Sequence, residues 1–410
     1  MNKFLLLFVS ALFLFSCSKN SAVQNPATSI TSLSVLSGNP DTQVTIDGSG
    51  FSSTLNNNTV QFNGVAAIVL SATPTVLVVK VPISCGNGPI TVTTPQGTAT
   101  SASFTYLPDV IVGGIELNGT NGIAKYWKNG TATAVSDGSK YEIIYSMKVS
   151  GSDIYLAGYE TASNGISIAK FWKNGTAVPL TDGTHNAKAY SIFIVGTDVY
   201  VAGTEFNANG ISVAKYWKNG TAVALTDGTG NAEGLCIFVN GTDVYLSGDE
   251  AILYGQSVAK FWKNGVATSL TNLPNSETSA SQIAVSGNDV HVIISEWNNS
   301  TIYQYWKNGV TTLIPGATQI DNLLIVGNDV YFSGSQSKIA SYWKNMIATS
   351  LSDGTNSAFA HAITVYNNDV YVTGDEFNGT VKVGKYWKNG VATNLTNGTY
   401  DAALWGITVR

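Results

Sequence analysis

The sequence predicts an all-β protein in two parts, a small β-sandwich followed by a seven-bladed β-propeller that the C-terminal strand closes. The chain of 410 residues contains 41 glycines but only 10 prolines, and it is rich in Val, Ile, Thr and Tyr, as expected of many short strands joined by tight turns. Seven of its nine tryptophans recur in one sequence setting. The end of the chain also matches a strand that the first repeat lacks.

The repeat is clearest around its tryptophans. Trp127 lies in the segment Tyr-Trp-Lys-Asn-Gly, and six other tryptophans likewise follow an aromatic residue and precede Lys-Asn: Trp172, Trp217, Trp262, Trp306, Trp343 and Trp387. The spacings between them are 45, 45, 45, 44, 37 and 44 residues. A period in this range is typical of repeat architectures.

One repeat, at 190–229, contains four predicted strands, named A to D here: 191–195, 198–203, 213–218 and 222–226. Two-residue turns, Gly196-Thr197 and Asn219-Gly220, supply the positive φ that antiparallel hairpins need. Four antiparallel strands with apolar residues on both faces predict a propeller blade packed against two neighbours. In the sixth repeat Met346 replaces the turn glycine, which should cost roughly 1 kcal/mol or change the turn type.

The two ends of the repeat region are complementary. The first repeat opens at Asp109 on strand B and lacks a strand A, whereas residues 404–409 match strand A of the other repeats. Ile407 falls in register with Met147 and Ile192. The C-terminal strand is therefore predicted to complete blade one, closing a seven-bladed propeller over 108–410 without an open sheet edge. The repeats resemble bacterial kelch-like or YVTN-like propeller repeats, without the signature of either.

Residues 29–107 show short alternating runs separated by Asp-Gly, Asn-Gly and Gly-Pro, which predict a β-sandwich. The segments that characterise this region follow in order: Asp47-Gly48-Ser49-Gly50-Phe51, Phe62-Asn63-Gly64, Val81-Pro82, Gly88-Pro89-Ile90-Thr91-Val92 and Phe104-Thr105-Tyr106. This series resembles the IPT/TIG family of immunoglobulin-like domains. The resemblance implies an Ig-like β-sandwich that serves as a spacer or interaction module.

The first 17 residues have the features of a secretory signal. Lys3 precedes an apolar run at 4–15, and Leu14-Phe15-Ser16-Cys17 resembles a bacterial lipobox, in which Cys17 would carry the lipid. An ordinary signal peptide with an incidental Cys17 is the alternative. Residues 18–28 are expected to be a flexible tether. The lipobox-like segment predicts a lipoprotein of the bacterial cell envelope, at the outer membrane or cell surface, attached to the membrane through Cys17.

Composition excludes several kinds of protein. Charged residues make up 11% of the chain, the formal net charge is −5, and Arg410 is the only arginine, so a nucleic-acid partner is not expected. Cys85 and Cys236 lie in different domains and predict no disulfide. We find no metal-ligand spacing, nucleophile motif or phosphate loop, so the sequence indicates no catalytic residue, cofactor or metal.

A ring of acidic residues is predicted on one rim of the propeller, called the top here, where strands B end and strands A begin. Seven residues after each strand-B aspartate stands a glutamate, or a glutamine in the sixth blade: Glu116, Glu160, Glu205, Glu250, Glu296, Gln336 and Glu376. The ring could bind a cation, a basic partner or sugar hydroxyls. Alternatively, each glutamate pairs within its blade with a strand-C lysine: Lys125, Lys170, Lys215, Lys260 or Lys385. On the opposite rim, the turn lysines Lys128 to Lys388 predict a basic ring.

Residues that break the repeat are better candidates for a specific site, because a ligand rarely has seven-fold symmetry. The start of strand A reads Tyr145, Tyr190, Leu235, Ser281, Asp321, His361 and Trp405. Flat aromatics beside a few polar groups are typical of pockets for sugars and small ligands. Packing particular to a pore mouth is the alternative.

Together these patterns predict a binding protein that engages a carbohydrate or protein ligand at the top rim. Two alternatives stay open. One is a glycan lyase or hydrolase acting at the axial mouth through Asp321, His361 or a top-rim glutamate. The other is a non-catalytic scaffold of the envelope.

Overall fold

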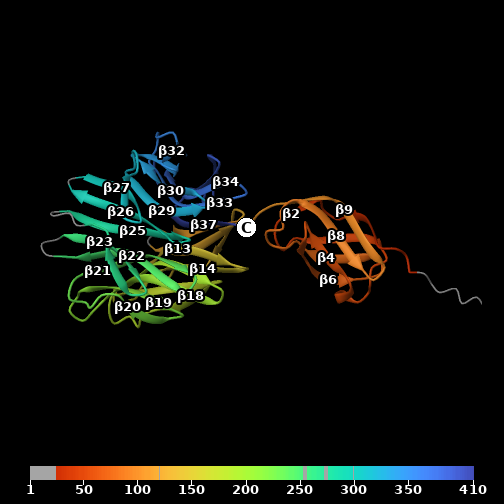
Figure 1. Cartoon of the computed structure of the whole chain (residues 1–410), viewed down its shortest axis with the longest axis horizontal. Helices are drawn as coiled ribbons and strands as arrows, with labels where there is room; N and C mark the ends of the chain where they lie inside the picture. Colours follow the sequence, from red (N-terminus) through yellow and green to blue (C-terminus); the bar gives the residue numbers. More distant parts are fainter. Residues whose placement is uncertain (1–24, 120, 253–255, 272–275, 299) are drawn as a thin grey trace, which may run out of the picture. The chain divides into compact units, whose positions relative to one another are not determined.

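A computed structural model describes residues 25–119, 121–252, 256–271, 276–298 and 300–410. Over these ranges the chain is all-β, with one short 3-10 helix, η1 (Leu55–Asn57). It divides into two compact units, the first ending at Leu107 and the second beginning at Pro108 (Figure 1). Within the described ranges no helix is long and apolar enough to cross a membrane. Cys17 lies outside the described residues.

The first unit is a β-sandwich of two sheets. One sheet has the strand order β1-β3-β7-β6 and the other β2-β9-β8-β4-β5. The strands are β1 (Ser29–Leu33), β2 (Ser37–Gly38), β3 (Gln43–Ser49), β4 (Thr59–Phe62), β5 (Val65–Ala66), β6 (Ile68–Ala72), β7 (Val76–Lys80), β8 (Gly88–Thr94) and β9 (Gly97–Tyr106).

The core of this sandwich follows the alternation of apolar residues along each strand. Val44 and Ile46 of β3 are fully buried, and Phe62 and Phe104 meet edge to face, with ring centroids 5.1 Å apart. Because alternate residues of a strand face opposite sides, these residues fill the space between the two sheets. Strands β1, β2 and β5 were not expected from the sequence, since they carry no clear apolar alternation.

The second unit consists of seven four-stranded antiparallel sheets, numbered as blades 1 to 7. Blade 1 contains β10 (Val110–Leu117), β11 (Gly122–Lys128), β12 (Thr131–Ala134) and β37 (Ala402–Val409), and blade 2 contains β13 (Glu142–Ser150), β14 (Asp153–Thr161), β15 (Ser167–Lys173) and β16 (Thr176–Pro179). Blade 3 contains β17 (Ala187–Val195), β18 (Asp198–Phe206), β19 (Ser212–Lys218) and β20 (Thr221–Ala224). Blade 4 contains β21 (Ala232–Asn240), β22 (Asp243–Ala251), β23 (Ser257–Lys263) and β24 (Val266–Ser269).

Blade 5 contains β25 (Glu277–Ser286), β26 (Asp289–Asn298), β27 (Ser300–Lys307) and β28 (Val310–Leu313). Blade 6 contains β29 (Gln319–Val326), β30 (Asp329–Gln336), β31 (Ile339–Lys344) and β32 (Ile347–Ser350). Blade 7 contains β33 (Ala358–Tyr366), β34 (Asp369–Phe377), β35 (Lys382–Lys388) and β36 (Val391–Asn394). A single parallel bridge, Ser257 to Glu277, joins the sheets of blades 4 and 5.

The blades form a closed ring. The C-terminal strand β37 pairs with β10 and so supplies strand A of blade 1, as the sequence predicted. It also packs against β33 of blade 7 and β13 of blade 2 (Figure 1). Seven hydrophobic clusters lie between successive blades, and the last of them joins blade 7 to blade 1. This is the seven-bladed β-propeller predicted from the repeats.

The repeated aromatic pair on strand C packs each blade against both neighbours. In blade 3, Trp217 lies in the cluster shared with blade 2, and the adjacent Tyr216 packs against the cluster shared with blade 4. Neighbouring residues on a strand point to opposite faces, which explains this division. Six of the seven repeat tryptophans are among the largest fully buried side chains.

The Lys-Asn pair after each tryptophan ties the turn between strands C and D to the start of strand B. In blade 3, Asn219 donates from its amide to Asp198 at 2.9 Å and accepts from the Val199 N–H at 2.8 Å, while Lys218 pairs with the other carboxylate oxygen of Asp198 at 3.0 Å. All seven blades repeat the lysine–aspartate pair. The predicted basic ring was therefore wrong, because an aspartate stands beside every lysine.

Two local predictions can be compared with the backbone. Strand A of blade 3 was expected at 191–195, but β17 begins four residues earlier because the A–B ladder continues beyond an irregularity at Tyr190. The turn residues Asn345 and Met346 both adopt positive φ, 49° and 70°, so Met346 keeps the repeat's turn instead of changing its type.

Candidate functional site

All seven blades carry a β-bulge at the same position of strand A. In each A–B ladder the register shifts by one residue at one place, and the residue left without a partner is Tyr145, Tyr190, Leu235, Ser281, Asp321, His361 or Trp405. These are the residues that the sequence singled out, and we call them the bulge ring. A bulge bends the strand and redirects a side chain away from the regular ladder.

A strand-B glycine accompanies this bulge in six of the blades. In blade 3, a Cβ on Gly203 would stand 2.0 Å from the Lys188 carbonyl oxygen of strand A. Strand A can therefore approach closely where the ladder becomes irregular. Blade 5 has Ile294 at the equivalent position and is bulged as well, so glycine favours the bulge without being essential to it.

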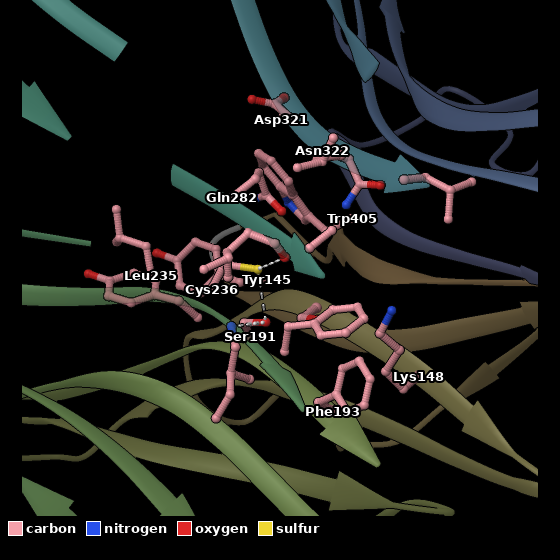
Figure 2. Close-up of a pocket in the computed structure, with 18 of the residues that line it drawn as sticks. Tyr145, Lys148, Ser191, Phe193, Leu235, Cys236, Gln282, Asp321, Asn322 and Trp405 are labelled. Atoms are coloured by element: carbon pink, nitrogen blue, oxygen red, sulfur yellow. Dashed lines mark hydrogen bonds between the residues drawn. The ribbon is translucent and has the colours of Figure 1, made fainter. Parts of the chain in front are cut away.

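A cavity of about 220 Å³ lies on the axis of the ring, since residues from all seven blades line it. Six members of the bulge ring contribute to its lining: Tyr145, Tyr190, Leu235, Asp321, His361 and Trp405. Gln282 and Asn322, which directly follow bulge-ring positions on their strands, also line the wall (Figure 2). Their side-chain amides make no hydrogen bond within the described part of the chain, and so remain available to a ligand.

The aromatic members of the bulge ring form one continuous surface. Tyr145 contacts Tyr190 and Trp405, with ring centroids 5.2 Å and 6.4 Å apart, and the Trp405 and His361 rings are tilted against each other with centroids 4.0 Å apart. Burial raises the pKa of both Tyr145 and Tyr190, so both phenols stay protonated at neutral pH. The surface therefore offers flat apolar faces together with hydroxyl groups.

His361 and Asp321 form an ion pair with each other. His361 Nδ1 lies 2.7 Å from Asp321, and its Nε2 lies 2.7 Å from Asp375, a fully buried carboxylate that Lys382 approaches at 3.6 Å. Burial lowers the pKa of His361, but the hydrogen bonds to both aspartates outweigh it and raise the pKa to about 9. His361 is thus a charged, buried support for Trp405, while Asp321 keeps partial exposure at the cavity.

A second acidic group stands at the same rim in blade 4. Glu233 of β21 and Asp249 of β22 are directly opposite each other in the ladder, and Asp249 accepts a hydrogen bond from Ser279 at 2.6 Å. Burial raises the pKa of both carboxyls, that of Asp249 to about 6. Glu233 also lines a second cavity of about 380 Å³, with Lys188, Tyr159 and Tyr190. Tyr190 therefore borders both cavities.

The glutamate ring is paired within the blades. Five glutamates bind the strand-C lysine of their own blade: Glu116–Lys125 at 2.6 Å, Glu160–Lys170 at 2.5 Å, Glu205–Lys215 at 2.6 Å, Glu250–Lys260 at 2.5 Å, and Glu376–Lys385. Glu296 instead accepts hydrogen bonds from Gln304 and Ser276. None of the six lines the axial cavity among the described residues. The alternative interpretation, pairing within each blade, is the one the structure shows.

Sequence reasoning found the bulge ring but missed the residues around it. Glu233, Asp249 and Asp375 depart from the repeat at their own positions, and so do Gln282 and Asn322 below the ring. Comparing every strand-A and strand-B position across the blades, and not the first strand-A position alone, would have found them.

Neither cysteine of the described residues forms a disulfide: Cys85 and Cys236 are free and buried. In the described ranges no group of three or more His, Cys, Asp or Glu side chains is arranged to hold a metal ion.

Comparisons with solved structures give distant similarities over most of the chain. A protein of unknown function from Bacteroides thetaiotaomicron is 11% identical, with a TM-score of 0.46, over 94% of this chain and 99% of that one. An auxiliary nutrient binding protein from the same organism is 12% identical, with a TM-score of 0.39, over 94% and 98%. Trypanosoma rangeli sialidase in complex with sialic acid is 10% identical, with a TM-score of 0.38, over 69% and 55%.

No curated protein matches the chain. One family model does match, that of the IPT/TIG domain, over residues 28–106. This segment coincides with the sandwich that the sequence assigned to 29–107. The first unit of the chain is therefore an IPT/TIG domain.

Proposed function

We propose that the propeller is a recognition module that binds a carbohydrate at its axial mouth, defined as the bulge ring and the upper wall of the axial cavity. The observation that carries this proposal is the continuous aromatic surface of Tyr145, Tyr190 and Trp405 beside a cavity with free amide groups. Sugar rings present apolar C–H faces that pack on aromatic rings, while their hydroxyls need hydrogen-bond partners. The Gln282 and Asn322 amides supply such partners.

A glycan array probed with the full chain tests this proposal. Binding to one class of glycan is expected, and Trp405→Ala should abolish it because the variant removes the largest ring of the aromatic surface. Trp297→Ala is the matched control, since Trp297 is 54% exposed and does not line the cavity. Equal loss in both variants, or no loss in Trp405→Ala, would contradict the proposal. A co-purifying protein without any glycan signal would favour a protein partner or a scaffold role.

A glycan hydrolase or lyase is a second candidate, and one observation favours it. Glu233 and Asp249 face each other at the rim, and the raised pKa of Asp249, about 6, lets that carboxyl hold a proton near neutral pH. One protonated and one ionised carboxyl are what general acid–base chemistry on glycosidic bonds requires. Product release from a bound glycan that Asp249→Asn abolishes would support the enzyme. Bound glycan recovered intact would exclude it.

We further propose that the chain is a lipoprotein of the bacterial cell envelope, anchored through Cys17 and a tether at 18–28, with the IPT/TIG domain as spacer. The apolar run at 4–15 and the lipobox-like segment before Cys17 support this. Cells grown with an alkyne-tagged palmitate should label the wild-type chain but not Cys17→Ser. Equal labelling of both would contradict the lipid attachment.

A further inference from the structure

The axial cavity contains one charged group that the bulge ring does not account for. Lys148 of β13 lines the cavity wall three residues beyond Tyr145. At a rise of about 3.3 Å per residue, its backbone lies roughly 10 Å farther along the axis than the ring. Figure 2 shows Lys148 beside Phe193, on the opposite side of the drawn residues from Asp321. It is the sole charged side chain among the described lining residues below the ring.

No side chain of the described chain neutralises Lys148. The turn lysines and the strand-C lysines opposite the glutamates each have a carboxylate within 4 Å, whereas Lys148 has none. Its nearest recorded interaction is with the Phe193 ring, whose centroid lies 6.0 Å from Nζ. The Lys148 side chain is exposed and lines the cavity, whose walls desolvate its ammonium group.

The surroundings of Lys148 explain why an ion pair would matter there. At the same level of strand A the other blades place apolar residues on the wall: Phe193, Phe238, Ala284 and Leu324. Desolvation by these walls lowers the pKa of Lys148, which means that its charged form is penalised where it stands. A partly desolvated ammonium without a counter-charge is disfavoured, and an anion that enters the cavity would supply that counter-charge.

Lys148 also departs from the pattern of its own position. Across the blades this position reads Lys148, Phe193, Phe238, Ala284, Leu324, Thr364 and Thr408. The apolar and Thr residues of the other blades show that the fold does not need a charge at this level. The ammonium group forms no ion pair with the described residues, and its cation–π contact with Phe193 is the one interaction that its charge makes there.

We propose that the axial cavity is specific for acidic sugars, and that Lys148 binds the oxyanion of such a ligand while the sugar ring packs on the aromatic surface above. This inference rests on the carbohydrate proposal and narrows it to one class. The cavity is graded in chemistry along its axis: aromatic faces at the ring, free amides of Gln282 and Asn322 beneath, then the single ammonium. A uronic acid carries its carboxylate as C6, bonded directly to ring carbon C5. A sulfated sugar presents the same charge on a longer arm.

Matched acid and neutral sugars test the proposal on the full chain by isothermal titration calorimetry. The pairs are galacturonate with galactose, glucuronate with glucose, and galactose 6-sulfate with galactose. The acidic member of at least one pair should bind about tenfold more tightly, because a hydrogen bond between charged groups is stronger than one between neutral groups. Carboxylate and sulfate are separated by which pair shows the preference. Equal affinity within all pairs would overturn the inference while leaving the carbohydrate proposal intact; binding of no sugar would overturn both.

Two variants assign the preference to the lysine. Lys148→Met should remove the acid preference yet keep affinity for the neutral sugar, and Lys148→Arg should retain the preference. Lys338→Met is the control, because Lys338 is exposed in the turn between β30 and β31 and lies outside the cavity. An acid preference that survives in Lys148→Met would overturn the assignment. The wild-type comparison needs no variant, so a misfolded Lys148→Met would still leave the class of ligand decided.

Discussion

The outer turn, which is the turn between strands C and D, and the bulge ring each recur at one position in every blade. The sequence of the outer turn is nearly the same in all blades, whereas that of the bulge ring varies. The turn after strand C carries the same Trp-Lys-Asn in all seven blades, and each copy makes the same contacts to its strand-B aspartate. The bulge ring has the same backbone in all seven blades, but almost every copy has a different side chain.

Under the proposed function, this contrast separates residues that stabilise the propeller from residues that bind its ligand. A repeated backbone with repeated side chains is what packing between like blades requires, because every interface between neighbouring blades buries equivalent side chains. A repeated backbone with varied side chains is what the proposed binding of an asymmetric ligand would require. The glutamate ring illustrates the first case, because its repetition reflects pairing inside each blade.

The largest expected effect is the loss of a buried repeat tryptophan. Trp217→Ala should lower the free energy of unfolding by about 3–5 kcal/mol, because the fully buried indole leaves a cavity between blades 2 and 3. Trp405→Ala should cost much less, since Trp405 is only partly buried at the mouth. Urea unfolding of both variants measures the difference. Similar losses of unfolding free energy in the two variants would contradict the comparison, because Trp405 would then stabilise the fold as much as a buried repeat tryptophan does.

The next effect concerns His361, the charged member of the bulge ring that supports Trp405. The pKa of His361 is about 9 in the folded protein, above the roughly 6.5 of an unfolded chain, so its stabilising contribution is present below pH 6.5 and lost as pH rises through 9. His361→Gln should cost on the order of 1–3 kcal/mol at pH 6 and flatten this pH dependence. Thermal unfolding between pH 6 and 10 checks it; a wild-type curve without that decline would contradict the ion pair.

A smaller effect is expected from one outer turn. Asn219→Gly retains the positive φ of 50° but removes the amide that joins Asp198 to the turn. The expected loss is about 1 kcal/mol, with glycan binding unchanged. Unfolding and binding measured on one preparation test both halves. If affinity fell while stability held, the outer turn would belong to the recognition surface.

The smallest effect is expected at the C–D turn of blade 6, where Met346 replaces the glycine of the other blades. Met346→Gly should stabilise the protein by about 1 kcal/mol or less, because Met346 is held at a φ of 70° where the other six blades have glycine. Asn345 remains as the internal control, since its side-chain bonds to Asp329 and Val330 are untouched. A destabilised Met346→Gly would mean that packing of the Met346 side chain outweighs the strain.

The sequence predicted the ring of blades well and the site only in part. Period, turn residues and the matching ends of the chain are local signals, so blade number and closure by β37 followed from them. Register shifts depend on pairing between strands, so the bulge at Tyr190 could not be read from one strand. The two aspartates that bind His361 come from strands of two different blades, β29 and β34, and such convergence appears only once the blades are packed side by side.

Binding by two triple variants tests most directly whether recognition lies where the repeat is broken. One changes the mouth, Tyr145→Ser, Tyr190→Ser and Trp405→Ser, to the residue that blade 5 carries there; the other changes the outer turns, Lys173→Gln, Lys218→Gln and Lys263→Gln. Calorimetry with the glycan that the wild-type chain prefers should find binding lost in the folded mouth variant and unchanged in the turn variant. A folded mouth variant with wild-type affinity, or loss of binding in the turn variant alone, would contradict the account.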